Sequence, residues 1–190
     1  TPYGETFMKL TGEYSIPASR EAVWEALNDP AVLQACIPGC ESLDTTGDNE
    51  FSAQVTAKVG PVKAKFKGKV TLSDLVPPQS YRITGEGQGG AAGFAKGGAT
   101  VNLTSDGNGT TLAYDVEATV GCKLAQIGQR LIDSTAKKMA DDFFDTFIER
   151  LGGAPEETAV IEILPNHDKG TKAAMILLAI VFALALYSQF

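Results

Sequence analysis

Segments in which apolar and polar residues alternate, followed by one segment with helical spacing, constrain the fold of this chain most strongly. The alternating segments are residues 8–16, 51–59, 62–72, 81–88, 99–104 and 111–120. Successive side chains point to opposite faces of a β-strand, so this pattern predicts six half-buried strands. A shorter alternating stretch near Leu43 is compatible with a further strand at the edge of the sheet.

Capping residues between the first two alternating segments predict two short helices. Ser19 is placed to cap a first helix that carries Trp24. Asp29 and Pro30 then supply a cap and a first helical residue for the second helix.

From about Cys122 to Leu151 the apolar residues recur at helical spacing. This segment predicts one helix of about 30 residues, roughly 45 Å long. A curved antiparallel sheet with one apolar face must have that face covered, and this helix is the only predicted element large enough. The sequence therefore predicts an α+β fold of the helix-grip type, with a curved antiparallel sheet around a long C-terminal helix.

Small residues occupy many of the inward-facing positions of the predicted strands. They are Ala53, Ala57, Ala64, Gly68, Gly85, Gly87, Ala99 and Ala118. Because protein interiors are close-packed, small side chains indicate either tight packing of the helix on the sheet or an internal void. One helix does not fill a strongly curved sheet without large side chains, so we favour a void, which would be an apolar ligand cavity.

The hypothesised cavity draws its residues from the strands, the first short helix and the long helix. They are Trp24, Phe51, Ala57, Phe66, Tyr81, Gly85, Gly87, Tyr114, Ala118, Leu131, Thr135, Met139 and Phe143. Ligand pockets are mostly apolar with a few polar groups, which Tyr81, Tyr114, Ser134 and Thr135 could supply here. At Trp24 a role in the core is favoured over a ligand contact.

The glycine-rich stretch 85–98, GEGQGGAAGFAKGG, contains spacings that mimic a nucleotide-binding fingerprint. A dinucleotide site requires a strand, this turn and then a helix, whereas strands are predicted on both sides here. We interpret the stretch as a bent or bulged strand pair with little side-chain bulk, near the mouth of the cavity.

Charge argues against nucleic acid as a partner. The chain has 16 basic and 23 acidic residues, a formal net charge of −7, whereas phosphate contacts require clustered Lys and Arg. A basic strand face carries Lys63, Lys65, Lys67 and Lys69. It is interpreted as solvated, with docking to an acidic partner or to anionic lipid headgroups as the alternative. Asp141, Asp142 and Asp145 follow Lys137 and Lys138 at helical spacing and predict an ion-pair face rather than an acid–base pair.

Cysteine and histidine are too few to suggest a metal or redox centre. Cys36 and Cys40 are four residues apart, Cys122 stands alone, and His167 is the only histidine. The usual structural zinc site therefore lacks ligands, and no metal site is predicted. We interpret the thiols as small buried groups in a reducing compartment.

The predicted helix-grip domain spans residues 8–153 and is flanked by segments of different character. Residues 1–7 are interpreted as an upstream extension or a cloning remnant, and residues 154–172 as a linker. Residues 173–190 are almost wholly apolar. As a helix they would be about 27 Å long, against roughly 30 Å of bilayer hydrocarbon.

We therefore predict that residues 173–190 anchor the protein in a membrane. The residues that favour insertion are Ile176, Leu177, Leu178, Ile180, Val181, Phe182, Leu184 and Leu186. Lys169 and Lys172 precede this run and predict that the folded domain lies on the cytoplasmic face of the cell membrane. The alternatives are a buried partner segment and a helix through which copies of the chain form an oligomer.

Three stretches resemble the family of carbon monoxide dehydrogenase G subunits, within the Bet v 1/START-like superfamily, over about residues 8–151. They are MKLTGEYSIPASREAVWEALNDPAVLQACIPGCESL, GEGQGGAAGFAKGGATVNL and GCKLAQIGQRLIDSTAKKMADDFFDTF. The resemblance implies a helix-grip fold with a hydrophobic ligand cavity. It also implies an accessory role beside a molybdenum hydroxylase such as carbon monoxide dehydrogenase, attaching that enzyme to the membrane and linking it to respiratory quinone. It implies no catalytic residue.

Three functions remain open from the sequence. The first is a membrane-anchored recruitment factor that carries a lipid or a respiratory quinone (menaquinone or ubiquinone) without any covalent cofactor. The second is a cyclase- or hydratase-like enzyme that uses the same cavity, and the third is a membrane-tethering scaffold without a ligand. No His, Asp or Glu faces inward in the strand alternation, which argues against the enzyme.

Overall fold

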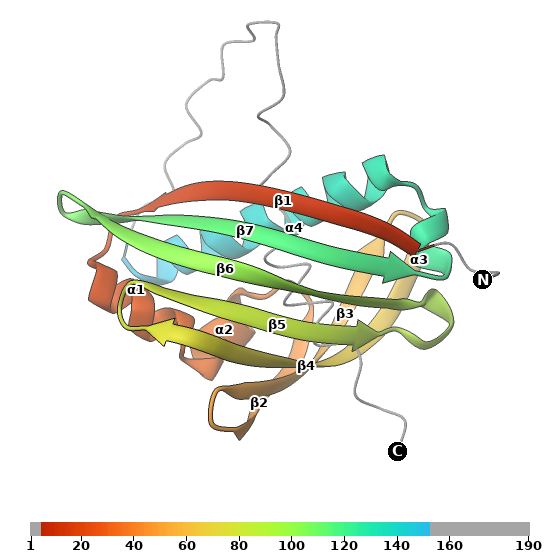
Figure 1. The fold of residues 1–190 in the computed structure, drawn as a ribbon, viewed down its shortest axis with the longest axis horizontal. Coiled ribbons are helices and arrows are strands. Elements are labelled where there is room, and N and C mark those ends of the chain that lie inside the picture. Colours follow the sequence, from red (N-terminus) through yellow and green to blue (C-terminus); the bar gives the residue numbers. More distant parts are fainter. Residues whose placement is uncertain (1–4, 153–190) are drawn as a thin grey trace, which may run out of the picture.

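The alternating segments form one seven-stranded antiparallel sheet in the computed structural model, which describes residues 5–152 (Figure 1). The strands are β1 (Glu5–Ile16), β2 (Cys40–Gly47), β3 (Glu50–Val59), β4 (Val62–Val76), β5 (Ser80–Gln88), β6 (Phe94–Asp106) and β7 (Gly109–Gly121). Their order is β1-β7-β6-β5-β4-β3-β2, so β2 to β7 form a meander and β1 lies beside the last strand. The six predicted strands and the edge strand near Leu43 are confirmed.

Several strands extend beyond the alternating pattern. The strand β1 begins at Glu5, which pairs with Gly121, and β4 continues to Val76. The predictions for the linker at 154–172 and the membrane anchor at 173–190 lie outside the described residues. Within residues 5–152, no helix has both the length and the apolar character needed to cross a membrane.

Two short helices follow β1, as the caps predict. They are α1 (Arg20–Leu27) and α2 (Pro30–Cys36). The Ser19 hydroxyl accepts a hydrogen bond from the Ala22 amide at 3.3 Å, and Asp29 Oδ1 accepts one from the Ala31 amide at 2.8 Å. Each cap satisfies an amide that has no partner within its own helix.

The prediction of one continuous helix from Cys122 to Leu151 is wrong. The segment forms a single turn, α3 (Lys123–Gln126), and then α4 (Gln129–Arg150), which has 22 residues. The break falls at Gly128, whose φ of +93° lies outside the helical region. Glycine lacks the Cβ that disfavours this conformation, so the chain changes direction here at little cost.

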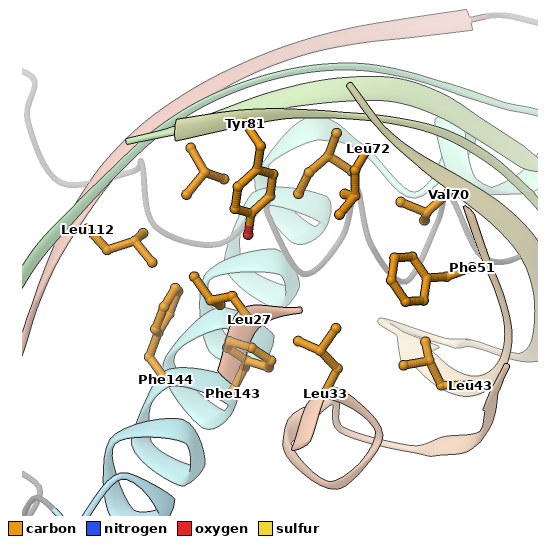
Figure 2. A pocket seen from close by; sticks show the side chains of 12 residues that line it. Leu27, Leu33, Leu43, Phe51, Val70, Leu72, Tyr81, Leu112, Phe143 and Phe144 are labelled. Carbon is orange, nitrogen blue, oxygen red and sulfur yellow. The ribbon is translucent and has the colours of Figure 1, made fainter. Parts of the chain in front are cut away.

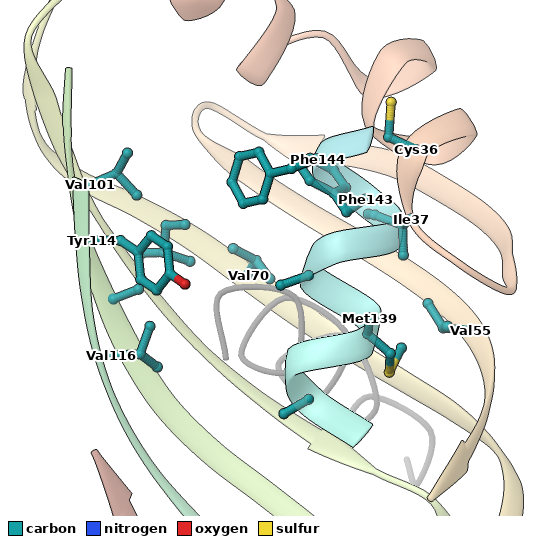
Figure 3. Packing of buried hydrophobic residues seen from close by; sticks show 14 of the residues in the cluster. Cys36, Ile37, Val55, Val70, Val101, Tyr114, Val116, Met139, Phe143 and Phe144 are labelled. Atoms are coloured by element: carbon teal, nitrogen blue, oxygen red, sulfur yellow. The ribbon is translucent and has the colours of Figure 1, made fainter. Parts of the chain in front are cut away.

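The helix α4 lies in the concave side of the sheet and covers its apolar face (Figure 1). Phe143, Phe144 and Phe147 are buried on α4, and the rings of Phe143 and Phe147 are stacked at 5.5 Å. Figure 3 shows the helix facing Val101, Tyr114 and Val116 of the sheet. The fold is therefore the predicted helix grip, with its core between helix and sheet.

The strands β5 and β6 pair in continuous register from Ser80 to Gln88, without a bulge. The glycine-rich stretch 85–98 belongs to this strand pair, as interpreted from the sequence. It joins β5 to β6 through a 3₁₀ turn, η1 (Gly90–Ala92). A Cβ on Gly97 would collide with the Glu117 carbonyl oxygen of β7, so glycine permits the close approach of these strands.

Candidate ligand-binding cavity

An apolar cavity of about 40 Å³ lies where α4, α1 and α2 meet the sheet (Figure 2). Its lining residues come from these three helices and from the strands β2 to β7, and they are nearly all aliphatic or phenylalanine. They are Leu27, Leu33, Leu43, Phe51, Val70, Leu72, Tyr81, Ile83, Val101, Leu112, Phe143 and Phe144. On the scale of about 10–15 Å³ for one water molecule, this space holds only a few waters.

Tyr81 is the one lining residue whose side chain carries a polar atom. It lies on β5, is 5% exposed, and has its hydroxyl directed into the cavity in Figure 2. No hydrogen-bond partner for this hydroxyl lies within residues 5–152. Burial raises the pKa of Tyr81 well above its usual value, so the group stays protonated and can donate a hydrogen bond.

The Tyr81 ring is held from two sides. Trp24 of α1 meets it edge-on, with ring centroids 5.4 Å apart and planes at 81°. On the sheet, Tyr81 pairs with Val101, which in turn pairs with Tyr114. Edge-to-face aromatic pairs are favourable because the positive edge of one ring meets the negative face of the other. Trp24 therefore orients the hydroxyl without lining the cavity itself.

Tyr114 is a second buried tyrosine without a hydrogen-bond partner. It is 3% exposed, and its hydroxyl has no partner within the described part of the chain. Figure 3 shows this hydroxyl directed from the sheet towards α4. Burial, and then the negative charge of Asp141, raise the pKa of Tyr114. It does not belong to the cavity lining.

Of the residues hypothesised for the cavity, Phe51, Tyr81 and Phe143 are brought together in its lining. Five others are buried in the core but do not line the cavity: Ala57, Phe66, Gly87, Ala118 and Met139. Gly85 is partly buried and does not line it either. Leu131 is 47% exposed. The Ser134 and Thr135 hydroxyls donate to the Leu131 carbonyl oxygen of their own helix, at 3.1 and 2.9 Å.

Nine lining residues are absent from the predicted set, because that prediction rests on small inward side chains and this cavity is lined by large ones. The missed residues are Leu27, Leu33, Leu43, Val70, Leu72, Ile83, Val101, Leu112 and Phe144. Large side chains leave a space where several elements converge without interdigitating. The inward positions of Val70, Leu72, Ile83, Val101 and Leu112 follow from the strand alternation, but the convergence of these strands with the helices does not.

Several charged residues on the surface form ion pairs, including two lysines of the basic strand face. Lys65 Nζ lies 2.7 Å from Glu41 Oε2, and Lys69 Nζ lies 2.6 Å from Glu50 Oε2. On α4, the predicted ion-pair face is confirmed by the pairs Lys137–Asp141 and Lys138–Asp142, both at 2.8 Å. Within residues 5–152, no group of three or more His, Cys, Asp or Glu side chains could hold a metal ion.

The three cysteines are unpaired. Burial raises the pKa of the Cys40 thiol to about 11 and also raises that of Cys36. A raised thiol pKa lowers the fraction of reactive thiolate, so these two residues have the character of small core side chains.

Comparison with solved structures supports the class of protein that this fold defines. A conserved protein from Geobacillus kaustophilus has 32% identity and a TM-score of 0.73, over 76% of this chain and 95% of that one. A START superfamily protein from Mycobacterium smegmatis has 10% identity and a TM-score of 0.59, over 76% and 97%. The Zhui aromatase/cyclase from Streptomyces sp. R1128 has 10% identity and a TM-score of 0.56, over 77% and 94%.

These likenesses, together with the sheet, α4 and the apolar cavity between them, define a START-like helix-grip fold. The comparison with curated proteins yields no match. The family model of the carbon monoxide dehydrogenase G subunit (CoxG) matches residues 12–152, and the chain belongs to this family.

Proposed function

We propose that this protein is an accessory protein of a molybdenum hydroxylase of the carbon monoxide dehydrogenase type, and that it binds and carries a respiratory quinone (menaquinone or ubiquinone). The observation that carries the ligand-binding part is the apolar cavity with one polar side chain directed into it. Membership of the CoxG family supports the partner. The quinone is favoured because the partner would need an electron acceptor that is soluble in the membrane.

Ligand entry requires the cavity to widen. Pockets for drug-sized ligands have volumes of about 300–1,000 Å³, far more than the 40 Å³ present here. A narrow space is expected without ligand, because voids in a core are unfavourable and side chains relax into them. Burial of an apolar ligand contributes roughly 0.8 kcal/mol per CH₂ group, which offsets the rearrangement. Leu33 on α2 is only partly buried and is a suitable residue to move.

The ligand is tested by mass spectrometry of an organic extract of the protein purified from its own host. We expect a quinone in the extract, and we expect the extracted protein to take up added menaquinone. If the extract holds no hydrophobic molecule and the protein takes up no quinone, the ligand-free scaffold is correct instead.

Residues 173–190 supply the membrane attachment in this proposal and place the domain on the cytoplasmic face of the cell membrane. In detergent-free solution, the same apolar tails would associate and form an oligomer. Deletion of residues 173–190 should release a folded domain from membranes, and circular dichroism checks the folding. A truncated protein that stays on membranes through a salt wash contradicts the anchor.

The partner is tested by deleting the gene in the host. The hydroxylase should remain active with an artificial dye but move to the soluble fraction or lose its coupling to respiration. Unchanged membrane activity would contradict the accessory role.

Binding without catalysis is favoured over an enzymatic role. The lining contains no His, Asp, Glu, Lys or Cys that could act as acid, base or nucleophile. The Zhui aromatase/cyclase shares the fold at 10% identity, which carries no activity to this chain. Turnover of a bound compound by the purified protein would contradict this part of the proposal.

A further inference from the structure

The cavity has an unusual polar feature for an otherwise apolar space. The Tyr81 hydroxyl faces eleven purely apolar lining residues and has no hydrogen-bond partner within residues 5–152 (Figure 2). Buried hydroxyls are nearly always hydrogen-bonded, because an unpaired one loses its bonds to water without replacement. Phenylalanine would occupy the same position without that loss. Tyr114 is also unpaired among the described residues but lies outside the lining, whereas the Tyr81 hydroxyl faces a space that another molecule can enter. The Tyr81 hydroxyl therefore indicates a partner that enters the cavity.

The surroundings of Tyr81 leave its hydroxyl directed into the cavity. Trp24 holds one side of the ring edge-on at 5.4 Å, and Val101 lies opposite on the neighbouring strand. A protonated phenol hydroxyl can donate one hydrogen bond, and the complementary group on an apolar molecule is an acceptor such as a carbonyl oxygen. A single water molecule could also satisfy the hydroxyl, and the test below separates the two.

We propose that the Tyr81 hydroxyl donates a hydrogen bond to a carbonyl oxygen of the bound ligand, so that the cavity selects apolar carbonyl compounds over hydrocarbons of the same shape. This inference rests on the proposed ligand-binding function and specifies how the head of the ligand is recognised.

Two other tyrosines provide matched controls. The Tyr14 hydroxyl already donates to Asp141 Oδ1 at 2.9 Å, so it is not free to bind a ligand. Tyr114 has no partner but lies outside the cavity lining. Each substitution Tyr→Phe removes one oxygen atom and leaves the ring in place.

The experiment compares two probes of nearly the same shape, 2,3-dimethyl-1,4-naphthoquinone and 2,3-dimethylnaphthalene. Neither has the open quinone carbon that reacts with thiols. Their affinities for the full chain and for Tyr81→Phe, Tyr114→Phe and Tyr14→Phe are measured by equilibrium dialysis, with the same buffer and detergent in both compartments. We expect Tyr81→Phe to lower the ratio of quinone to hydrocarbon affinity about three- to tenfold, which is the usual worth of one hydrogen bond. The two control variants should leave the ratio unchanged.

Infrared spectroscopy provides an independent measurement. The carbonyl stretching band of the bound quinone should lie at lower wavenumber in the wild-type protein than in Tyr81→Phe, because a hydrogen bond weakens the C=O bond. An unchanged ratio and an unchanged band in Tyr81→Phe would overturn the inference, with the hydroxyl then satisfied by water. A loss confined to Tyr114→Phe would overturn the assignment to Tyr81. If the wild type binds neither probe, the ligand-binding function fails together with this inference.

Discussion

The hydroxyl of Tyr14 donates a hydrogen bond of 2.9 Å to Oδ1 of Asp141, and this contact joins the first strand to the long helix. The Tyr14 ring also stacks on Phe144, with centroids 3.9 Å apart. Lys137 holds the other carboxylate oxygen of Asp141 at 2.8 Å. The contact therefore fixes α4 against β1 at the edge of the core, close to the cavity residue Phe144.

Tyr14→Phe should lower the free energy of unfolding by about 1 kcal/mol, since it removes a hydrogen bond to a charged group that is partly solvated. Burial, and then the hydrogen bond to Asp141, raise the pKa of Tyr14 above its usual value of 10.0. This stabilisation is thus present below about pH 10 and is lost as the pH rises through the folded-state pKa. Urea unfolding at pH 7 measures the effect.

Tyr114→Phe is the matched control for that measurement. Its hydroxyl is buried without a partner, so its removal should leave the stability unchanged or raise it. Equal losses from both substitutions would show that the Tyr14–Asp141 contact contributes nothing specific.

Val101→Leu should fill part of the 40 Å³ cavity and reduce the uptake of menaquinone. The extra carbon enters a space that is already present, so the free energy of unfolding should change by less than about 1 kcal/mol. Ligand uptake is measured by extraction and mass spectrometry, and stability by urea unfolding.

Val116→Leu tests whether that effect is local. Val116 is fully buried on the same face of the sheet but does not line the cavity. The same substitution there overpacks the core and should cost about 1–3 kcal/mol. If Val101→Leu costs as much as Val116→Leu, the cavity is not available space.

The carboxylate of Glu41 should titrate at an unusually low pH. The hydrogen bond from Lys65, and then those from Thr56 and Gln54, lower its pKa from 4.5 to about 2. The stabilisation from these contacts is fully present above about pH 4.5 and is lost as the pH falls through about 2. NMR titration of the Glu41 side chain checks the midpoint. Lys65→Ala should raise it, whereas Lys67→Ala on the same strand face should leave it in place.

Cys122→Gly should stabilise the protein by about 1 kcal/mol. Cys122 has a φ of +62° and a ψ of −135°, a backbone conformation that costs about 1–3 kcal/mol in residues with a Cβ. Glycine removes this strain from the folded state. It also gives the unfolded chain more conformational entropy to lose on folding, which reduces the gain in stability. Thermal unfolding measures the change, and Cys122→Ala, which keeps the Cβ, should show no gain.

Local sequence patterns predicted the strands, their buried faces and both helix caps correctly, because each depends on neighbouring residues. In β4 the inward-facing Phe66 and Val70 are buried and Lys65 and Lys67 on the opposite face are exposed, as expected. The helix break at Gly128 was not predicted, because apolar residues recur at helical spacing on both sides of this glycine.

The sequence alone determined that this chain forms a curved sheet with one apolar face and a long helix to cover it. The reason is that the spacing of apolar residues along the chain differs between strands and helices. The sequence also determined which side chains of the strands face inward, but not those of the long helix, where Leu131 is exposed. Only the tertiary structure decided where the cavity lies, because Leu33, Tyr81 and Phe143 meet there from separate elements. The packing of α4 likewise decided which tyrosine hydroxyl has a partner. It brings Asp141 to the Tyr14 hydroxyl, whereas it brings only apolar side chains to the Tyr81 hydroxyl.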